Sequence, residues 1–326
     1  MVAGFPRITY ISWAESCSRS DHTARELGGR SHMVYAARLG SHPATIVPKY
    51  LVQWWRTRAI LNAEQPDVVF VMTPPVFAAI PAFWYAKWRG ARVVLDAHSA
   101  AFMHPRWRMF QWLQRALCRA AATTLVHNSH MAQVVERAKA TATLVPDVPI
   151  LFASVEAFER PAAFSVVCVC SYNPDEPIEQ MIEAARRCPD VRFYFTGNPK
   201  HLGAELRAQL PANVTLTGFL STGAYGGLLQ GADIVMALTT RDHTMLRVAY
   251  EAIYQETPVI VSNWGLLREW FDEGALHVDN SSDEIVEAIE QARRGLGKLD
   301  AGARRLRLRK LSAWASTRQA ILSRIG

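Results

Sequence analysis

The sequence has 326 residues, of which 50% are hydrophobic and 20% charged, and this composition excludes a disordered or fibrous protein. A chain of this length exceeds one ordinary core and predicts two domains. The formal net charge of +7, from 36 basic and 29 acidic residues, favours anionic partners such as phosphates, acidic lipids or nucleic acid.

The five cysteines show neither a metal-ligand spacing nor a disulfide framework, which favours reduced thiols in the cytoplasm. The first residues lack the long apolar region of a signal peptide. The longest apolar run, residues 76–86, is too short to cross a bilayer. We therefore expect a cytoplasmic protein.

The first half of the chain alternates short apolar runs with amphipathic stretches, as a doubly wound α/β domain does. We expect its strands at residues 7–13, 66–72, 91–99, 123–128 and 142–149, with an ambiguous one over 31–39. We expect its helices near Asp21, over 49–64, 74–90 and 105–121, and from Ser129.

Polar side chains stand near the strand ends of this first domain. Asp96 and His98 lie at the carboxyl end of the strand over 91–99, where open α/β sheets bind ligands. A neutral His98 can hydrogen-bond a reacting hydroxyl, and Asp96 points the same way along the strand. Such residues also often merely cap the next helix. Arg19, beside Ser20, can face a diphosphate, although loop arginines are more often solvated.

Residues 150–164 lack periodicity and predict a linker. The alternation then restarts, and we expect strands at residues 165–170, 191–196, 213–219, 232–238, 258–262 and 275–279. The last expected helix covers residues 311–325. This pattern predicts an α/β fold of two tandem Rossmann-like, doubly wound domains, residues 1–155 and 156–310, with a C-terminal helix over 311–326.

One stretch of the second half predicts a complete βαβ unit. Strands at 232–238 and 258–262 flank a polar elbow, Thr239–Thr244, and a helix over 245–255. Thr244 is the expected N-cap, so a phosphate would meet the N–H groups around it. Glu251 lies in an apolar segment and needs a partner there, which two ligand hydroxyls would supply.

This stretch resembles the donor-binding element of GT-B glycosyltransferases, in particular the retaining, family 4-like group 1 enzymes that use nucleotide sugars. Their pattern is Glu, seven residues, Glu, followed by Ala-x-x-x-x-x-Pro-Val-Ile-x-Ser. Glu251 matches the second glutamate, which binds the nucleotide ribose in that family. His243 replaces the first, which faces the donor sugar. The resemblance covers the whole chain, strongly in the second half, and implies two domains facing a cleft.

The resemblance also implies chemistry. The family cradles the diphosphate leaving group with helix N-termini and basic side chains, without a bound metal, and the nucleoside diphosphate sugar is a co-substrate, so no cofactor is expected. We predict His98, Asp96 and His243 as catalytic residues, and Arg19 and Ser20 on the acceptor or phosphate side. The predicted donor-binding residues are Glu251, Thr244, Met245, Leu246, Asp242, Gly197, Asn198, Ser171, Lys200 and Arg247. For Gly197 and Asn198 an ordinary turn is an equal alternative.

Aromatic and basic residues cluster together in the first domain, at residues 50–58, 84–89 and 106–112, and a basic run follows at 304–310. Tryptophan beside arginine on a helix suits the boundary of an anionic bilayer, and GT-B enzymes with lipid-linked acceptors have similar surfaces. The alternative is that these tryptophans fill the core. No clustered stripe or reading helix indicates nucleic acid, so none is expected as a partner.

The sequence thus predicts a hexosyltransferase that moves a sugar from a nucleoside diphosphate donor to an acceptor hydroxyl, without a metal and with retention by analogy. The acceptor is a lipid-linked molecule or a glycan, in cell-envelope or exopolysaccharide synthesis. The protein is expected in the cytoplasm, peripheral on the inner face of the plasma membrane. A catalytically inactive GT-B scaffold and a basic anion- or nucleic-acid-binding protein are the alternatives.

Overall fold

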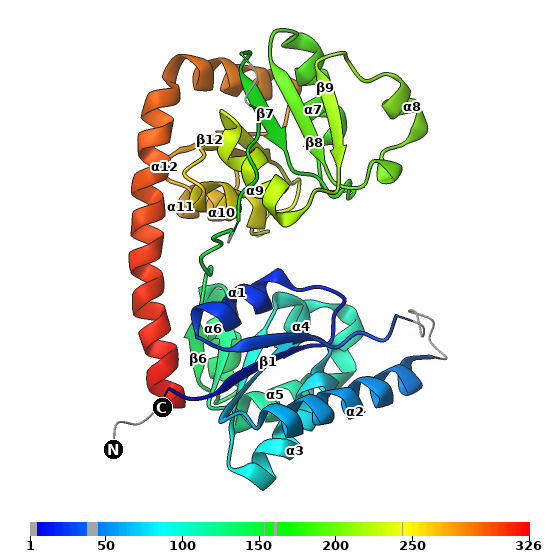
Figure 1. Cartoon of the computed structure of the whole chain (residues 1–326), viewed down its shortest axis with the longest axis vertical. Coiled ribbons are helices and arrows are strands. Elements are labelled where there is room, and N and C mark those ends of the chain that lie inside the picture. Colours follow the sequence, from blue (N-terminus) through cyan, green and yellow to red (C-terminus); the bar gives the residue numbers. More distant parts are fainter. Residues whose placement is uncertain (1–4, 38–44, 153, 160–161, 243) are drawn as a thin grey trace. The chain divides into compact units, whose positions relative to one another are not determined.

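The computed structural model describes residues 5–37, 45–152, 154–159, 162–242 and 244–326 (Figure 1). The chain forms two compact units. The first comprises residues 1–149 and 313–326, and the second residues 150–312. Ile150, assigned from the sequence to the first domain, lies in the core of the second unit, and its carbonyl accepts a hydrogen bond of 2.8 Å from the Gln255 side chain.

The sheet of the first unit has six parallel strands in the order β2-β1-β3-β4-β5-β6. They are β1 (Ile8–Ser12), β2 (Arg30–Met33), β3 (Val68–Thr73), β4 (Arg92–Ala97), β5 (Thr123–Val126) and β6 (Ala142–Leu144). Its helices are α1 (Ser18–Glu26), α2 (Ile46–Glu64), η3 (Val76–Ala78), α3 (Ala79–Arg89), α4 (Ser99–Met103), η4 (Pro105–Phe110), α5 (Gln111–Ala120) and α6 (Ser129–Arg137).

The sheet of the second unit also has six parallel strands, in the order β12-β11-β10-β7-β8-β9. They are β7 (Ser165–Cys168), β8 (Arg192–Thr196), β9 (Val214–Gly218), β10 (Ile234–Ala237), β11 (Val259–Ser262) and β12 (Ala275–Val278). Its helices are α7 (Ile178–Arg187), η5 (Pro199–His201), α8 (Ala204–Ala208), α9 (Thr222–Gly231), α10 (Arg247–Tyr254), α11 (Gly265–Trp270) and α12 (Ser282–Ile325), whose last residues belong to the first unit.

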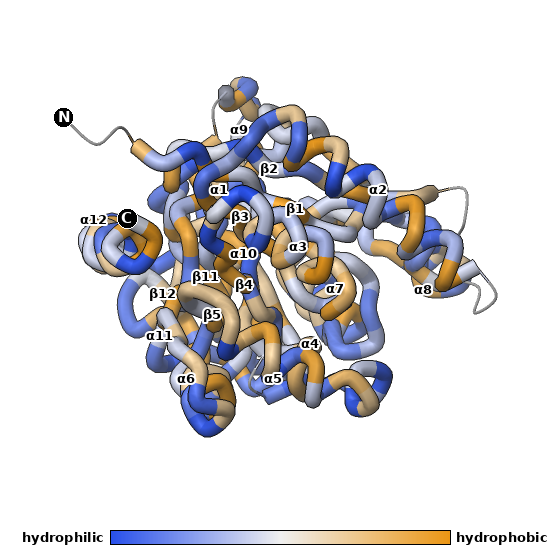
Figure 2. The backbone as a smooth tube through the Cα atoms, turned by 90° about the horizontal axis from the view of Figure 1, so that it is seen from below, coloured by the Kyte–Doolittle hydropathy of each residue, from blue (hydrophilic) through white to orange (hydrophobic). Residues whose placement is uncertain are grey.

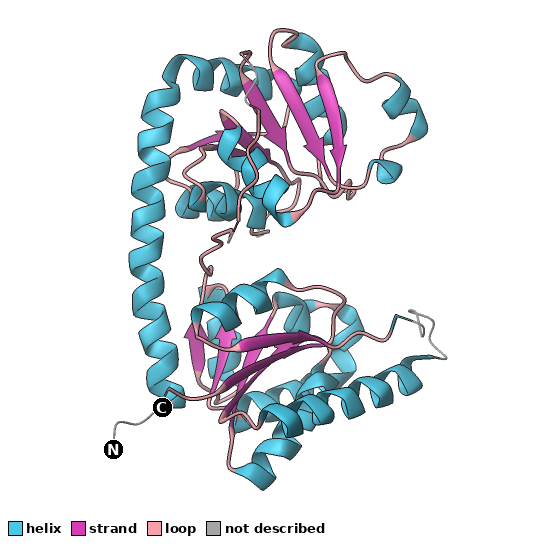
Figure 3. Cartoon of the chain, viewed as in Figure 1, coloured by secondary structure: helices cyan, strands magenta, loops and turns pink. Residues whose placement is uncertain are grey.

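The predicted fold class, two tandem doubly wound α/β domains, is confirmed (Figure 3). Some element boundaries differ from those expected. The strand expected over 142–149 ends at Leu144, because Pro146 and Pro149 cannot donate to a neighbouring strand. The helix expected over 105–121 begins as the 3-10 turn η4, and the helix expected over 311–325 is the last part of the long α12.

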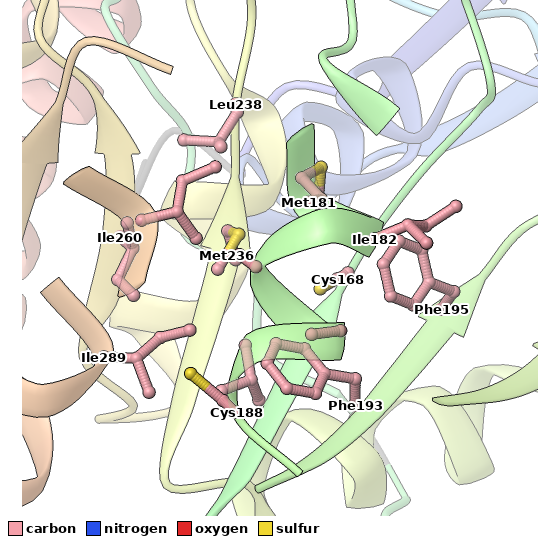
Figure 4. Packing of buried hydrophobic residues seen from close by; sticks show 14 of the residues in the cluster. Cys168, Met181, Ile182, Cys188, Phe193, Phe195, Met236, Leu238, Ile260 and Ile289 are labelled. Carbon is pink, nitrogen blue, oxygen red and sulfur yellow. The ribbon is translucent and has the colours of Figure 1, made fainter. Parts of the chain in front are cut away.

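Apolar side chains cover both faces of each sheet, as buried parallel strands require. All six residues of β3 are buried. On one face of the second sheet, α7 and the start of α12 close a core that includes Met181, Phe193 and Ile289 (Figure 4). Helices α9, α10 and α11 cover the other face. Burial of each large apolar side chain stabilises the folded state by about 2 kcal/mol. The packed core therefore holds each sheet rigid, and with it the strand ends from which the loops project.

The order of the strands defines one switch point in each sheet. In the first sheet the chain leaves β1 for β2 on one side and returns to β3 on the other, so the switch point lies between β1 and β3. In the second sheet it lies between β7 and β10 by the same reasoning. Ligands of open α/β sheets bind beyond the carboxyl ends of the strands at such points.

The last part of α12 docks on the first unit. The Trp314 indole donates a 2.8 Å hydrogen bond to the Glu26 carboxylate, and Ile321 lies in the core below β1. In the second unit, the Lys310 ammonium is buried among three rings, 4.6 Å from the Tyr250 ring centre. None of the helices that the structure describes is both long enough and apolar enough for a membrane crossing.

Candidate functional site

The elbow after β10 differs from the one the sequence predicted. Helix α10 begins at Arg247 with Leu246 as its N-cap residue, and no side chain caps it. The prediction that Thr244 caps the helix is therefore wrong, and the N–H groups of the first turn start at Arg247. Met245 and Leu246 pack against the apolar core, which draws this segment into extended backbone. The predicted His243 lies outside the described residues.

Glu251 is held by side chains of its own unit. The Arg247 Nε donates to Oε1 at 2.8 Å, and the Tyr225 hydroxyl of α9 donates to Oε2 at 2.6 Å. The Glu251 side chain is 13% exposed. Burial and the adjacent carboxylate together raise the pKa of Tyr225 well above its usual range, so the hydroxyl stays a donor. The predicted need for a partner is correct, and Arg247 and Tyr225 supply it without a ligand.

The loops on the two sides of the switch point are joined by hydrogen bonds. The Asp175 carboxylate, in the loop after β7, accepts from the Thr239 hydroxyl at 3.0 Å, and the Asp175 carbonyl accepts from the Thr240 N–H at 2.7 Å. The Thr239 N–H in turn donates to Ser262 Oγ of β11 at 2.8 Å. The carboxyl ends of three neighbouring strands are thereby fixed relative to one another.

A carboxylate occupies the backbone donors of the turn after β7. Glu176 accepts from the N–H of Ser171 at 3.0 Å and from the N–H of Asn173 at 3.2 Å. This acidic turn thus contains an anion already seated on main-chain donors, as a phosphate oxygen would be. A diphosphate reaches the Ser171 N–H only by displacing Glu176.

Gly197 follows β8 with a φ of +92°, and a Cβ there would lie 2.0 Å from the Cys170 carbonyl oxygen. Glycine is required at this position by the packing of the chain on itself. The Asn198 side chain caps η5 by accepting from the Lys200 N–H at 3.1 Å. The ordinary-turn alternative therefore accounts for Gly197 and Asn198, and the Lys200 side chain is exposed.

A pocket of about 940 Å³ opens at this edge of the second sheet. Residues that follow five of its strands line the pocket, among them Glu176, Thr240, Trp264 and Asn280. The predicted donor-binding residues are absent from the lining, although Ser171 and Lys200 each precede a lining residue. Glu251, Met245 and Leu246 lie with α10 on the other face of the sheet. The lining residues could have been found from the sequence, because each of their loops directly follows a predicted strand.

In the first unit, two predicted side chains, Arg19 and Asp96, are joined with Tyr10 in one buried cluster. The Arg19 Nε donates to Asp96 Oδ2 at 3.1 Å, an Arg19 Nη donates to the Val145 carbonyl at 3.1 Å, and the Tyr10 hydroxyl donates to Asp96 at 2.5 Å. Burial by itself would raise the pKa of Asp96, but the Arg19 charge holds it below its usual range. Asp96 is therefore an anion that fixes Arg19.

Two residues that the sequence predicts to contact substrate, Asp96 and Ser20, are too deeply buried to do so. Asp96 is 1% exposed and all its oxygens are engaged, so it acts by positioning Arg19. Ser20 is fully buried, and its hydroxyl pairs with the Ser12 hydroxyl at 2.7 Å. Neither residue is placed to touch a ligand. Arg19 is 17% exposed, which contradicts the alternative of a solvated loop arginine.

Two histidines lie beside this cluster. His98 directly follows β4 and precedes α4 without capping it by its side chain, and its Nε2 is buried with no hydrogen-bond partner among the described residues. Burial lowers the pKa of His98, and burial with the Arg19 charge lowers the pKa of His127 to about 4. Both imidazoles are neutral at pH 7, the state in which His98 can accept a proton.

The basic and aromatic residues divide between the units. On α12, Arg304, Arg305, Arg307 and Arg309 pair with carboxylates of their own unit, so the run at 304–310 is largely neutralised. In the first unit, by contrast, several tryptophans of these clusters lie outside the core, although Tyr85 is buried in it and Trp54 packs against it. Trp55, Trp88 and Trp112 are 68%, 71% and 69% exposed, which contradicts the alternative that the tryptophans of these clusters fill the core.

Among the described residues, no group of three or more His, Cys, Asp and Glu side chains is placed to share a metal ion.

Comparisons with known proteins agree with this architecture. Residues 163–294 match the family model "Glycosyl transferases group 1", and residues 14–147 match "Glycosyl transferase 4-like domain". No curated protein matches the chain at a significant level.

Among solved structures, the chain is similar to sucrose-phosphate synthase (tll1590) from Thermosynechococcus elongatus, with 13% identity, a TM-score of 0.70 and 97% of each chain covered. It is similar to Anabaena Alr3699/HepE in complex with UDP-glucose, with 13% identity and a TM-score of 0.61 over 95% of this chain and 100% of that one. A third is the lipopolysaccharide outer core galactosyltransferase WaaB in its apo form, with 12% identity and a TM-score of 0.56 over 92% and 95%.

Proposed function

This chain belongs to the group 1 glycosyltransferases and has the GT-B fold, and we propose that it transfers a sugar from a nucleoside diphosphate sugar to an acceptor hydroxyl. The observation that carries the proposal is the second unit's switch point. There, the loops after β7 and β10 are tied together by Asp175 beside a pocket of about 940 Å³. A pocket of this size accommodates part of such a donor, whereas the residues proposed for its ribose and diphosphate lie outside the pocket lining, on and beside α10.

The donor is bound by the second unit. Glu251 accepts hydroxyl groups of the nucleotide ribose on the carboxylate that Tyr225 and Arg247 orient. The diphosphate lies near the start of α10, where the helix dipole and Arg247 favour negative charge. The structure of Alr3699/HepE with UDP supports a uridine nucleotide as the first candidate.

The reaction proceeds without a metal and with retention, as in the enzymes whose Glu-x7-Glu pattern the elbow resembles. His98 hydrogen-bonds the reacting hydroxyl or the donor sugar with its neutral imidazole, whose Nε2 is unpartnered. His243 takes the place of the glutamate that faces the donor sugar.

The acceptor is a lipid-linked or glycan molecule of cell-envelope or exopolysaccharide synthesis. The protein binds it at the anionic, cytoplasmic face of the plasma membrane. The exposed tryptophans of the first unit support this association. Trp55, Trp84 and Trp88 are exposed on α2 and α3, and the Arg58 guanidinium stacks over Trp54 and Trp84 at 5.8 and 6.0 Å. Rings and charges in this arrangement are both satisfied at the headgroup boundary.

Calorimetric titration with UDP, GDP, ADP, TDP and CMP tests the donor site. One nucleoside diphosphate is expected to bind wild type and, at a hundredfold excess over its dissociation constant, to stabilise the fold by about 2.7 kcal/mol. Glu251→Ala is expected to weaken that binding by roughly 10- to 100-fold, the contribution of hydrogen bonds to a charged group.

Two further variants separate ribose binding from folding. Glu251→Gln keeps an acceptor for Tyr225 but loses the charge, so it folds as wild type and still binds more weakly. Glu269→Ala removes an exposed carboxylate from the neighbouring α11 and leaves binding unchanged. Absence of binding by all five nucleotides contradicts the proposed donor, and binding without any sugar transfer to lipid or glycan acceptors identifies an inactive scaffold.

A further inference from the structure

A second pocket, of about 600 Å³, lies within the first unit and differs in chemistry from that of the second. Its wall is formed by aromatic and aliphatic side chains. The aromatic ones are Trp13, Tyr50, Trp54, Phe77, Trp107 and Phe110. Among the described residues, Arg106 is the one charged residue that lines it. A volume of this size accommodates a chain of ten or so carbon atoms, and an apolar wall favours hydrocarbon over sugar.

The pocket stands at the switch point of the first sheet. Trp13 directly follows β1, and Phe77 follows β3. These are the two parallel strands that flank the switch point. Trp107 comes from η4, which follows β4. The pocket is thus at the same edge of the sheet as His98, where the proposed reaction places the acceptor hydroxyl.

The rings are packed against one another and form a shaped wall. Tyr50 lies 5.5 Å from Trp13 and 5.4 Å from Phe77 between ring centres, and Phe77 meets Phe110 edge-on at 4.8 Å. Such contacts hold the rings in place before a ligand arrives, so little side-chain entropy is lost on binding.

The rim of the pocket continues into an exposed apolar surface. On α2, Val47, Leu51 and Trp55 recur every four residues and are 68%, 56% and 68% exposed. On α3, Ile80, Trp84 and Trp88 recur in the same way and are also exposed. Hydrophobic residues of both helices are visible in Figure 2. Val47, Leu51 and Ile80 also line the pocket, so a chain leaving an apolar phase meets apolar surface along its path.

A positive charge is available where the chain would end. Arg106 is exposed, its guanidinium lies 5.7 Å from the Trp107 ring centre, and among the described residues it forms no ion pair with a carboxylate. Its charge is near enough to Tyr50 to lower the pKa of that phenol in part, against the larger effect of burial, which raises it. An apolar cavity with one cation is complementary to an amphiphile with one anionic group.

We propose that this pocket binds the hydrocarbon chain of a lipid phosphate acceptor and that Arg106 pairs with its phosphate. The inference rests on the proposed glycosyl transfer, because it names the acceptor class of that reaction. It requires no contribution from the second unit, so it is tested separately from nucleotide binding.

The test is calorimetric titration of the full chain, without nucleotide, with decyl phosphate below its critical micelle concentration. Binding is expected, with an affinity roughly tenfold above that of octyl phosphate, because two more CH₂ groups are buried. Decanol is expected to bind roughly tenfold more weakly than decyl phosphate, and inorganic phosphate not measurably. Arg106→Gln is expected to bind decyl phosphate and decanol equally.

Leu51→Asp places a charge on the pocket wall and is expected to weaken decyl phosphate binding at least tenfold. Its side chain is 56% exposed, so the fold should tolerate the change, which thermal unfolding checks. Trp55→Asp, one turn further along α2 and outside the pocket, is the matched control and should bind as wild type.

Three results overturn the proposal. They are equal affinity for octyl and decyl phosphate, equal binding by Leu51→Asp and wild type, and a self-association of the chain that Leu51→Asp abolishes and decyl phosphate does not affect. The last result would identify a second copy of the chain as the occupant. None of these results affects the nucleotide titration. Conversely, failure of the protein to bind any nucleotide would contradict the proposed donor but not the proposal for this pocket.

Discussion

The two sheets share an architecture, but their carboxyl edges differ in chemistry. Each is the edge of a six-stranded parallel sheet with one switch point, and a pocket opens at each. In the first unit the pocket wall is aromatic and the neighbouring polar cluster, Arg19 with Asp96, is buried. In the second unit the loops carry exposed polar groups, and Glu176 occupies main-chain donors at the surface.

The difference indicates that one architecture can present two kinds of surface. A sheet edge offers a hollow and helix starts wherever it occurs, but the side chains placed there decide what it binds. From the apolar pocket wall at the first edge we expect a preference for apolar groups. From fixed hydrogen-bonding groups such as Asp175 and Glu176 at the second edge we expect a preference for polar ones. The stability of each edge should accordingly depend on different interactions.

The largest effect is expected at the first edge. Arg19→Ala leaves the buried Asp96 carboxylate without its charge partner, and the free energy of unfolding should fall by about 3–5 kcal/mol in urea denaturation. The double variant Arg19→Ala with Asp96→Asn removes the unpaired charge and should regain most of that loss. If the single and double variants have the same free energy of unfolding, the ion pair of Arg19 and Asp96 does not stabilise this edge of the sheet.

At the second edge the backbone should matter more than charge. Gly197→Ala introduces a Cβ 2.0 Å from the Cys170 carbonyl oxygen at a φ of +92°, and should lower the free energy of unfolding by about 3 kcal/mol. Gly203→Ala, six residues further on in open space at a negative φ, is the matched control and should change it by less than about 0.5 kcal/mol. Comparable losses in both would mean that the close approach is relieved by a shift of the loop.

The pH dependence of stability should come partly from His127 at the first edge. Its pKa is about 4 in the folded protein and about 6.5 when unfolded, so the unfolded chain takes up the proton first as the pH falls. This group contributes stability above pH 6.5 that is lost toward pH 4, about 2 kcal/mol of it between pH 7 and pH 5. His127→Gln should reduce the slope of unfolding free energy against pH in that interval. An unchanged slope would contradict the assigned pKa.

Local sequence patterns predicted most of the fold. The unit of β10, α10 and β11 was placed within two residues at each strand end, because runs of β-branched residues between polar segments leave few alternatives. The same local reasoning found that Glu251 needs a partner. It failed for Thr244, because the packing of Met245 and Leu246 on the core overrode the preference of threonine for an N-cap.

Sequence alone determined the alternation of strands and helices and the residues that follow each strand, since these depend on neighbours one or two turns away. Only the tertiary structure decided which of those residues meet. Arg19 pairs with Asp96, 77 positions later, because the sheet order brings β1 near β4, and Glu176 turns back onto Ser171 because the loop closes on itself. Periodicity records which side of an element faces the core, but it contains no information on strand order, and strand order brings distant charges together.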